Sequence, residues 1–340
     1  MWTNANMKED AKFHLRGAWP TAIGVLLIIS IITSILTQII SSVVSFVFIG
    51  GSIFSLIDMQ NFSDPNYFNS PENVDLLLRL IPLIIGVGLI TTLLASVVSI
   101  FVSLPLGASA KNWFIRNRET PEAPEFGLLF NHYAKNFKKL VFAAFWQSLW
   151  ILIWSLPMVA GTILYILAFY TSFYTYNLPD GTNMATMEPS MSFFIMIFLG
   201  MLLIFVGNII VLNRSYAYFM MFSVMADNPD VGGKRAMELS KKMMKGNKLH
   251  LLGLQLSFIG WILLTMLTCG IGLVVLNPYI EQTNAEVYAR LRSIAVERGD
   301  TTMEELGFVS LNQSSKNTME FAADPRYPHN NFNNNNPTGL

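Results

Sequence analysis

One acidic residue, Glu281, is placed by the sequence where it could do chemistry inside a membrane. It falls within a predicted helix over residues 271–290, and ten residues at about 1.5 Å each would carry it about 15 Å inward, near the middle of a bilayer core about 30 Å thick. A carboxylate at that depth would be a functional site. The alternative is that this helix is half of a shallow hairpin, so that Glu281 lies in a wet vestibule at the cytoplasmic side.

A channel or uncoupled permease is the transport function that these residues would support. Its path would be lined by Asn208, Asn277 and Glu281 together with small residues of the neighbouring helices. Paired carboxylates, which are typical of proton-coupled carriers, are not available, because the other predicted spans contain no Asp or Glu. Coupled transport therefore has little support.

The basic stretch 231–248 is a second candidate, for contacts with anionic lipid headgroups. We predict a surface helix along the inner leaflet, with Met243 and Met244 as apolar anchors. Each Lys or Arg near a negatively charged surface contributes about 1 kcal/mol. The headgroup contacts predicted here are four lysines: Lys241, Lys242, Lys245 and Lys248. The alternative is an ordinary inner loop that is basic only because such loops are retained inside.

Other chemistry has no motif in this sequence. A lone cysteine, Cys269, and four scattered histidines provide no zinc-ligand spacing, and no phosphate-cradling glycine loop or nucleophile elbow is present. We therefore predict no catalytic residue, no cofactor, no metal site and no enzymatic activity. A stripe of three tryptophans, Trp146, Trp150 and Trp154, could form a ligand wall, although packing and interface anchoring are the ordinary roles of such a stripe.

The elements that would position these residues are transmembrane helices. The chain is 52% hydrophobic and 13% charged, which departs in both respects from soluble proteins. We expect an all-α polytopic bundle over residues 20–295, a cytoplasmic segment over 1–19 and a disordered Asn-rich cytoplasmic tail over 300–340. The predicted helices lie near 20–49, 79–108, 140–174, 192–212, 249–268 and 271–290.

The distribution of Lys and Arg predicts the orientation. Four segments placed inside hold 3, 6, 6 and 5 of the 22 basic residues, and the two placed outside, 50–78 and 175–191, hold none. Six crossings with both ends in the cytoplasm fit this pattern, in a multi-pass protein of the plasma membrane. The rival prediction is five crossings, with the fifth helix ending near Leu276 and an external tail. The basic residues form no single patch, so no nucleic-acid partner is expected.

The chain resembles a family of bacterial integral membrane proteins known only as domain of unknown function number 975. The resemblance covers most of residues 1–295 and is strongest in the second half, with "WSLP" at 154–157, "ADNPD" at 226–230, "SKKMMKGNK" at 240–248 and "NPYIEQTNAEVYARL" at 277–291. The long apolar insertion between "WSLP" and "YAY" at 216–218 departs from the family pattern. The resemblance implies a membrane helix bundle and brings no activity, substrate or cofactor.

These observations favour a non-enzymatic accessory, scaffold or lipid-contacting membrane protein. Its expected partners are membrane lipids, with anionic headgroups as the specific candidate. The alternative function is the channel or uncoupled permease for a small solute.

Overall fold

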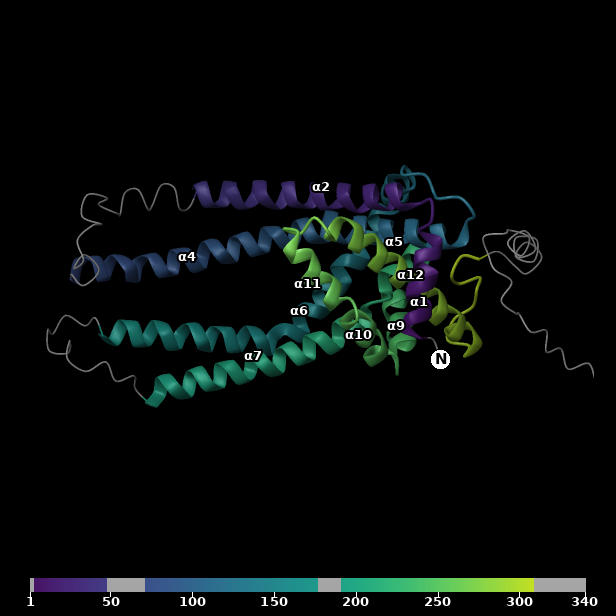
Figure 1. Cartoon of the computed structure of the whole chain (residues 1–340). Helices are drawn as coiled ribbons and strands as arrows, with labels where there is room; N and C mark the ends of the chain where they lie inside the picture. The colour runs from purple at the N-terminus through teal and green to yellow at the C-terminus, as the bar shows by residue number, and fades with distance from the viewer. Residues whose placement is uncertain (1–2, 48–70, 177–190, 309–340) are drawn as a thin grey trace, which may run out of the picture.

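The computed structural model describes residues 3–47, 71–176 and 191–308, and within these ranges the chain is helical, without strands. Figure 1 shows long helices extending from a body of shorter helices that contains the N-terminal helix α1. The predicted all-α polytopic bundle is therefore confirmed. The described residues include five stretches long and apolar enough to cross a membrane: Trp19–Ser45, Leu83–Glu119, Leu128–Thr171, Met191–Asp227 and Lys248–Leu267.

The first hairpin pairs α2 (Trp19–Ser45) with α4 (Pro71–Val98). Residues at spacing four on α2, Ile31, Ile35, Ile39 and Val43, are each 53–56% exposed. A continuous apolar stripe of this kind on a soluble surface would be unfavourable, so α2 presents it to lipid. The predicted external segments 50–78 and 175–191 lie largely outside the described residues.

The second predicted helix, 79–108, is longer than expected. α4 continues through a π-helical turn, η3 (Ser99–Ser103), into α5 (Leu104–Glu119), which reaches deep into the body. Pro105 causes the local change, because its ring nitrogen cannot donate to the carbonyl of Phe101 four residues earlier. The hydroxyl of Tyr133 donates to that carbonyl instead, at 3.1 Å.

The second hairpin consists of α6 (Leu128–Tyr176) and α7 (Met191–Tyr218), which pack closely along their length. A Cβ atom at Gly161 would lie 2.7 Å from the backbone oxygen of Gly200, and one at Gly207 would lie 2.6 Å from the backbone nitrogen of Met158. Only glycine permits this approach. α6 begins at Leu128, about 12 residues before the predicted start at residue 140.

The last hairpin corrects the predicted sixth crossing over 271–290. The chain enters through α10 (Lys248–Leu256) and α11 (Ile259–Leu267), turns at Cys269 and Gly270, which have positive φ values of 51° and 84°, and returns as α12 (Leu273–Glu297). Figure 1 shows that this turn ends short of the outer ends of α2, α4, α6 and α7. α12 is not among the candidate spans, and most of its second half is buried in the body.

The body is completed by α1 (Asn4–His14), α8 (Met221–Asp227), the short turn η4 (Pro229–Val231) and α9 (Gly233–Met244). Trp113 and Phe114 of α5, Tyr218 of α7 and Tyr288 of α12 are at most 1% exposed and form its centre. Burying large apolar side chains of this size stabilises the fold by about 1.5–3 kcal/mol each. The body is therefore a true protein core at one end of the membrane helices.

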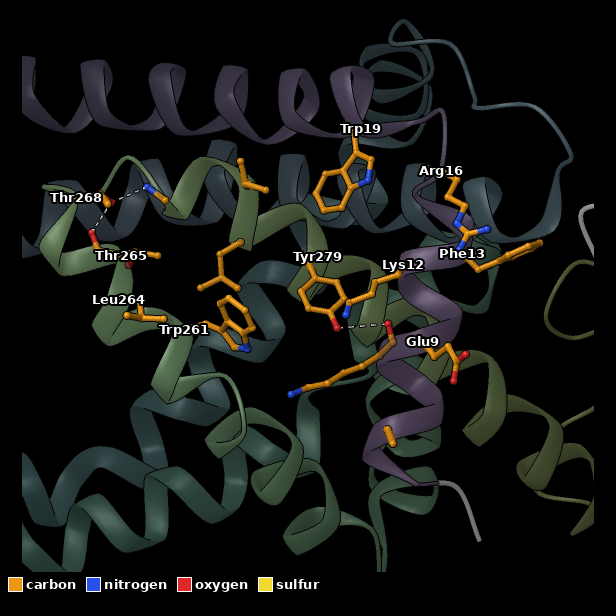
Figure 2. Close-up of a pocket in the computed structure, with 15 residues that line it drawn as sticks. Glu9, Lys12, Phe13, Arg16, Trp19, Trp261, Leu264, Thr265, Thr268 and Tyr279 are labelled. Atoms are coloured by element: carbon orange, nitrogen blue, oxygen red, sulfur yellow. Dashed lines mark hydrogen bonds between the residues drawn. The ribbon is translucent and has the colours of Figure 1, made fainter.

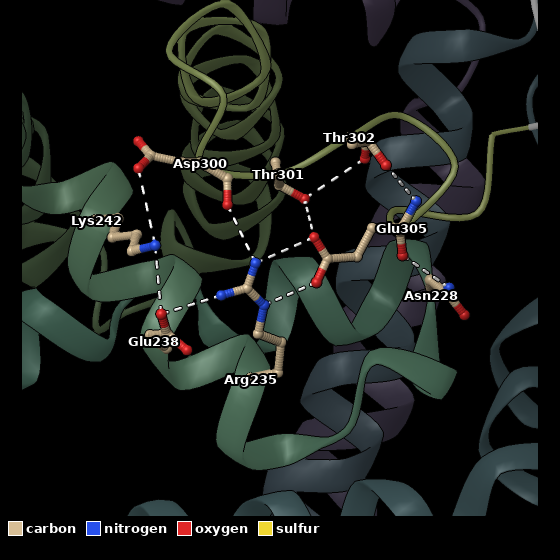
Figure 3. Close-up of polar contacts among 8 residues, drawn as sticks. All are labelled: Asn228, Arg235, Glu238, Lys242, Asp300, Thr301, Thr302 and Glu305. Carbon is tan, nitrogen blue, oxygen red and sulfur yellow. Dashed lines mark hydrogen bonds and ion pairs between the residues drawn. The ribbon is translucent and has the colours of Figure 1, made fainter.

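The ordered chain continues beyond residue 300, where a disordered tail was predicted to begin. Glu305 pairs with Arg235 of α9 at 2.7 Å, the backbone oxygen of Asp300 accepts from the same guanidinium at 3.1 Å, and Leu306 is 1% exposed. Figure 3 shows Thr301 and Asn228 completing this set of contacts. Residues 300–308 therefore belong to the body, because they bring an ion pair and a buried leucine to α9. Residues 309–340 of the predicted tail lie outside the described residues.

Candidate functional site: a cation–aromatic belt and an amphipathic groove

α12 carries a buried polar face that joins it to the rest of the body. Arg292 donates to Asp227 of α8 and to Glu119 of α5, both at 2.8 Å, and the hydroxyl of Tyr288 donates to the same oxygen of Asp227 at 2.6 Å. The side chains of Arg292 and Asp227 are only 9% and 2% exposed. Because a buried charge without its partner is costly, this cluster holds α12 in register with α5 and α8.

Glu286 forms a second buried cluster on the same helix. Its carboxylate lies 2.8 Å from Nδ1 of His14 and 2.7 Å from Nε of Arg118, and Asn117 donates to the Gln282 side chain at 3.0 Å. Burial would raise the pKa of the Glu286 carboxyl, but the hydrogen bond to His14 and the charge of Arg118 outweigh it, so the pKa is lowered. These groups are paired with one another, as in a structural network, and they fasten α1 and α5 to α12.

The three residues predicted to line a solute path are not brought together. Glu281 lies where α12 meets α5, with an oxygen 3.1 Å from Nζ of Lys111 and a side chain that is 31% exposed. Asn277 is exposed one turn earlier on α12. Asn208 is exposed on α7, where its amide donates to the carbonyl of Ile204 in its own helix at 2.8 Å. In the part of the chain that is described, Glu281 therefore contacts α5, and the three side chains share no polar path.

The basic helix predicted over 231–248 exists as α9, but its apolar face points elsewhere. Met243 and Met244 are 0% exposed and pack in the core of the body. They cannot anchor the helix in lipid, and that part of the prediction is wrong. The apolar face of α9 is covered by other parts of the protein. An amphipathic sequence alone does not show whether protein or lipid covers such a face.

The four lysines predicted to contact headgroups lie in different surroundings. Lys242 is 3.3 Å from a Glu238 oxygen, and Lys248 donates to Asn213 of α7 at 2.6 Å. Lys241 and Lys245 are exposed. Lys241 lies on the side of α9 that faces the membrane helices, with its ammonium 5.3 Å from the ring centre of Tyr218.

The tryptophan stripe of α6 forms one half of a belt where the second hairpin enters the body. Each ring has a cation near it, supplied by α9 or α7. The ammonium of Lys234 lies 4.7 Å from the Trp146 ring centre, that of Lys241 lies 5.8 Å from Trp150, and the guanidinium of Arg214 lies 3.8 Å from Trp154. We call these six residues the cation–aromatic belt. Such rings and cations belong at the boundary between hydrocarbon and headgroups.

An open groove of about 950 Å³ lies between α1 and the last hairpin. Figure 2 shows its two walls: Lys12 of α1 and Arg16 just after that helix at one end, and α11 with Trp261 and Leu264 at the other. Tyr279 of α12 lies between them, and its hydroxyl donates to the backbone oxygen of Lys8 at 3.3 Å. The groove therefore has one charged end and one apolar end.

The charged end is basic. Lys8 and Lys12 lie at spacing four on α1, Arg16 follows in the turn after this helix, and all three line the groove. Lys8 is held in place, because its ammonium donates to the Ser257 carbonyl at 3.2 Å and lies 4.2 Å from the Phe258 ring centre. Burial, and then the charge of Lys12, lower the pKa of Lys8. Lys12 and Arg16 are exposed, with the Lys12 ammonium 5.7 Å from the Tyr279 ring centre and the Arg16 guanidinium 5.9 Å from that of Phe13.

In the part of the chain that is described, no group of three or more His, Cys, Asp or Glu side chains is placed to hold a metal ion. The groove was not predicted from the sequence. A partial signal was present in the spacing of Lys8 and Lys12, which places two cations on one helix face, with Arg16 two residues beyond the end of that helix. Their partner wall is more than 240 residues away in the chain, so spacing alone could not reveal it.

Comparison with known proteins identifies a family but no activity. The family model described as "Protein of unknown function (DUF975)" matches residues 1–295, so the chain belongs to this family. No curated protein matches the chain. No solved structure matches it either.

Proposed function

We propose that this member of a membrane-protein family of unknown function is a non-enzymatic accessory or scaffold component of the plasma membrane that gathers anionic lipids around its cytoplasmic body. The observation that carries the proposal is the cation–aromatic belt. Its tryptophans suit the headgroup boundary, and Lys234 and Lys241 place positive charge at the same level.

The sidedness of the body follows from its charges. α1 packs on α12, so the N-terminal segment and the chain up to residue 308 lie on one side of the long helices. The basic segments between the spans lie in this same body, as the positive-inside rule requires of a cytoplasmic face. A reporter that is active only in the cytoplasm, fused after Asn312, should be active. A silent fusion produced at normal level would contradict this orientation.

The lipid preference is tested on the full chain in nanodiscs that contain equal amounts of an anionic and a zwitterionic phospholipid with the same acyl chains. Lipids retained after partial detergent stripping should be enriched in the anionic species. We expect Lys234→Gln/Lys241→Gln to reduce that enrichment, and the matched variant Lys135→Gln/Arg290→Gln, with the same loss of charge at exposed positions of α6 and α12, to leave it unchanged. Equal retention of both lipids by the unmodified chain would refute the proposal.

A further inference from the structure

The groove between α1 and the last hairpin joins two different environments. Its apolar wall comes partly from Trp261 and Leu264, which are 58% and 54% exposed and belong to the candidate span Lys248–Leu267. Its basic wall ends at Arg16, three residues before the span that starts at Trp19. The groove therefore runs from the depth of the hydrocarbon to the level of the headgroups.

We propose that this groove is a discrete binding site for one anionic amphiphile, a phosphate-bearing lipid whose head lies at Lys12 and Arg16 and whose chain lies along Trp261, Leu264 and Val275. The inference goes beyond the lipid preference of the belt, because it assigns a single ligand to a defined cavity. A volume of about 950 Å³ lies within the range of about 300–1,000 Å³ that is usual for such ligands.

Charge complementarity selects an anionic head. Three cations line the basic end, and one carboxylate, Glu9, is the acidic group among the lining residues. Figure 2 shows the Glu9 side chain turned away from Lys12 and the cavity. A phosphate between Lys12 and Arg16 would also relieve the repulsion that Lys12 exerts on Lys8.

The apolar end of the groove fits the acyl chain of a lipid rather than a second polar group. Thr265 and Thr268 line it, but their hydroxyls already donate to backbone carbonyls, at 2.7 Å to Ile262 and 2.9 Å to Thr265. Val275 is 51% exposed there and provides further apolar surface. A free phosphate would leave this surface without a partner, so the site fits a lipid better than a small anion.

The test is native mass spectrometry of the full chain in detergent, titrated with phosphatidylglycerol, with phosphatidylcholine of the same acyl chains, and with glycerol phosphate. We expect a 1:1 adduct that forms at the lowest concentration with phosphatidylglycerol. Lys12→Gln/Arg16→Gln should weaken it about 25-fold, since two surface cations each contribute about a factor of five. The charge-matched control Lys135→Gln/Lys138→Gln should leave its affinity unchanged.

A second pair of variants tests the apolar end without altering charge. Val275→Trp fills the groove and should abolish the adduct, whereas Leu263→Trp, at an exposed position of α11 that does not line it, should preserve the adduct. The assignment is overturned if phosphatidylcholine or glycerol phosphate binds as well as phosphatidylglycerol, or if groove and control variants behave alike. The lipid enrichment in nanodiscs is measured separately with Lys234→Gln/Lys241→Gln, so the groove and the belt can fail independently.

Discussion

Replacing Arg292 by methionine should destabilise the body strongly, because it removes the cation between two buried carboxylates. Asp227 and Glu119 each accept from Arg292 at 2.8 Å, and their side chains are 2% and 17% exposed. Tyr288 would still donate to Asp227, but it carries no charge. Removing one partner of a buried ion pair typically costs about 3–5 kcal/mol, and methionine keeps much of the side-chain volume.

The measurement is denaturant-induced unfolding of the full chain in micelles, followed by near-ultraviolet circular dichroism. Arg298→Met is the matched control near the end of the same helix, where the arginine is 42% exposed and lies 3.5 Å from Asp300, so its loss should cost at most about 1 kcal/mol. Adding Asp227→Asn and Glu119→Gln to Arg292→Met should recover part of the loss, since no carboxylate is then stranded. Equal losses for Arg292→Met and Arg298→Met would refute this reasoning.

Two further predictions concern the helix contact in the membrane and the response of the body to acid. Gly161→Ala should lower the free energy of unfolding by about 1–3 kcal/mol in the same assay, because its Cβ would lie 2.7 Å from the Gly200 oxygen. The control Gly86→Ala, with open space at its Cβ, should be neutral or stabilising. Equal effects of the two substitutions would argue against close α6–α7 packing. The pKa of Glu286 is lowered from its ordinary 4.5, so its contribution to stability is complete above that value and is lost as pH falls through the folded pKa. Glu286→Gln should therefore lower stability at pH 7 and weaken its decline below pH 4.5, and an unchanged acid profile would contradict this role.

The long membrane helices could be predicted from the sequence because each requirement is local. Runs such as that after Trp19 are apolar for more than 18 residues, and a bilayer leaves a single chain segment few alternatives to a helix. The residues at which these helices begin and end were less predictable. The extension of α5 to Glu119 depends on burial of Trp113 and Phe114 against residues far away in the chain. A local sequence pattern does not predict such long-range contacts.

The candidate sites were harder still to predict from the sequence, because contacts between distant residues decide them. Met243 and Met244 lie on an apolar helix face, and the sequence cannot state whether lipid or protein covers it; here α9 faces the core. Counting residues along a straight helix predicts Glu281 near the bilayer middle. In the structure it instead contacts Lys111 of the body, which lies 170 residues earlier in the chain. The three groove cations were visible as a charged segment, while the wall that turns them into a site was not.

α12 carries charges that disfavour a membrane crossing. Glu281, Glu286, Arg290 and Arg292 lie within twelve residues, and a charged residue costs about 2.5–3.5 kcal/mol at the middle of a bilayer, so four could cost up to about 10–14 kcal/mol. In the body, Glu286 and Arg292 instead bind partners on α1, α5 and α8. The chain after α11 turns back at Cys269 and Gly270, and this return places the apolar side of the hairpin beside the basic face of α1. The contacts that hold α12 in the body therefore also help to form the groove.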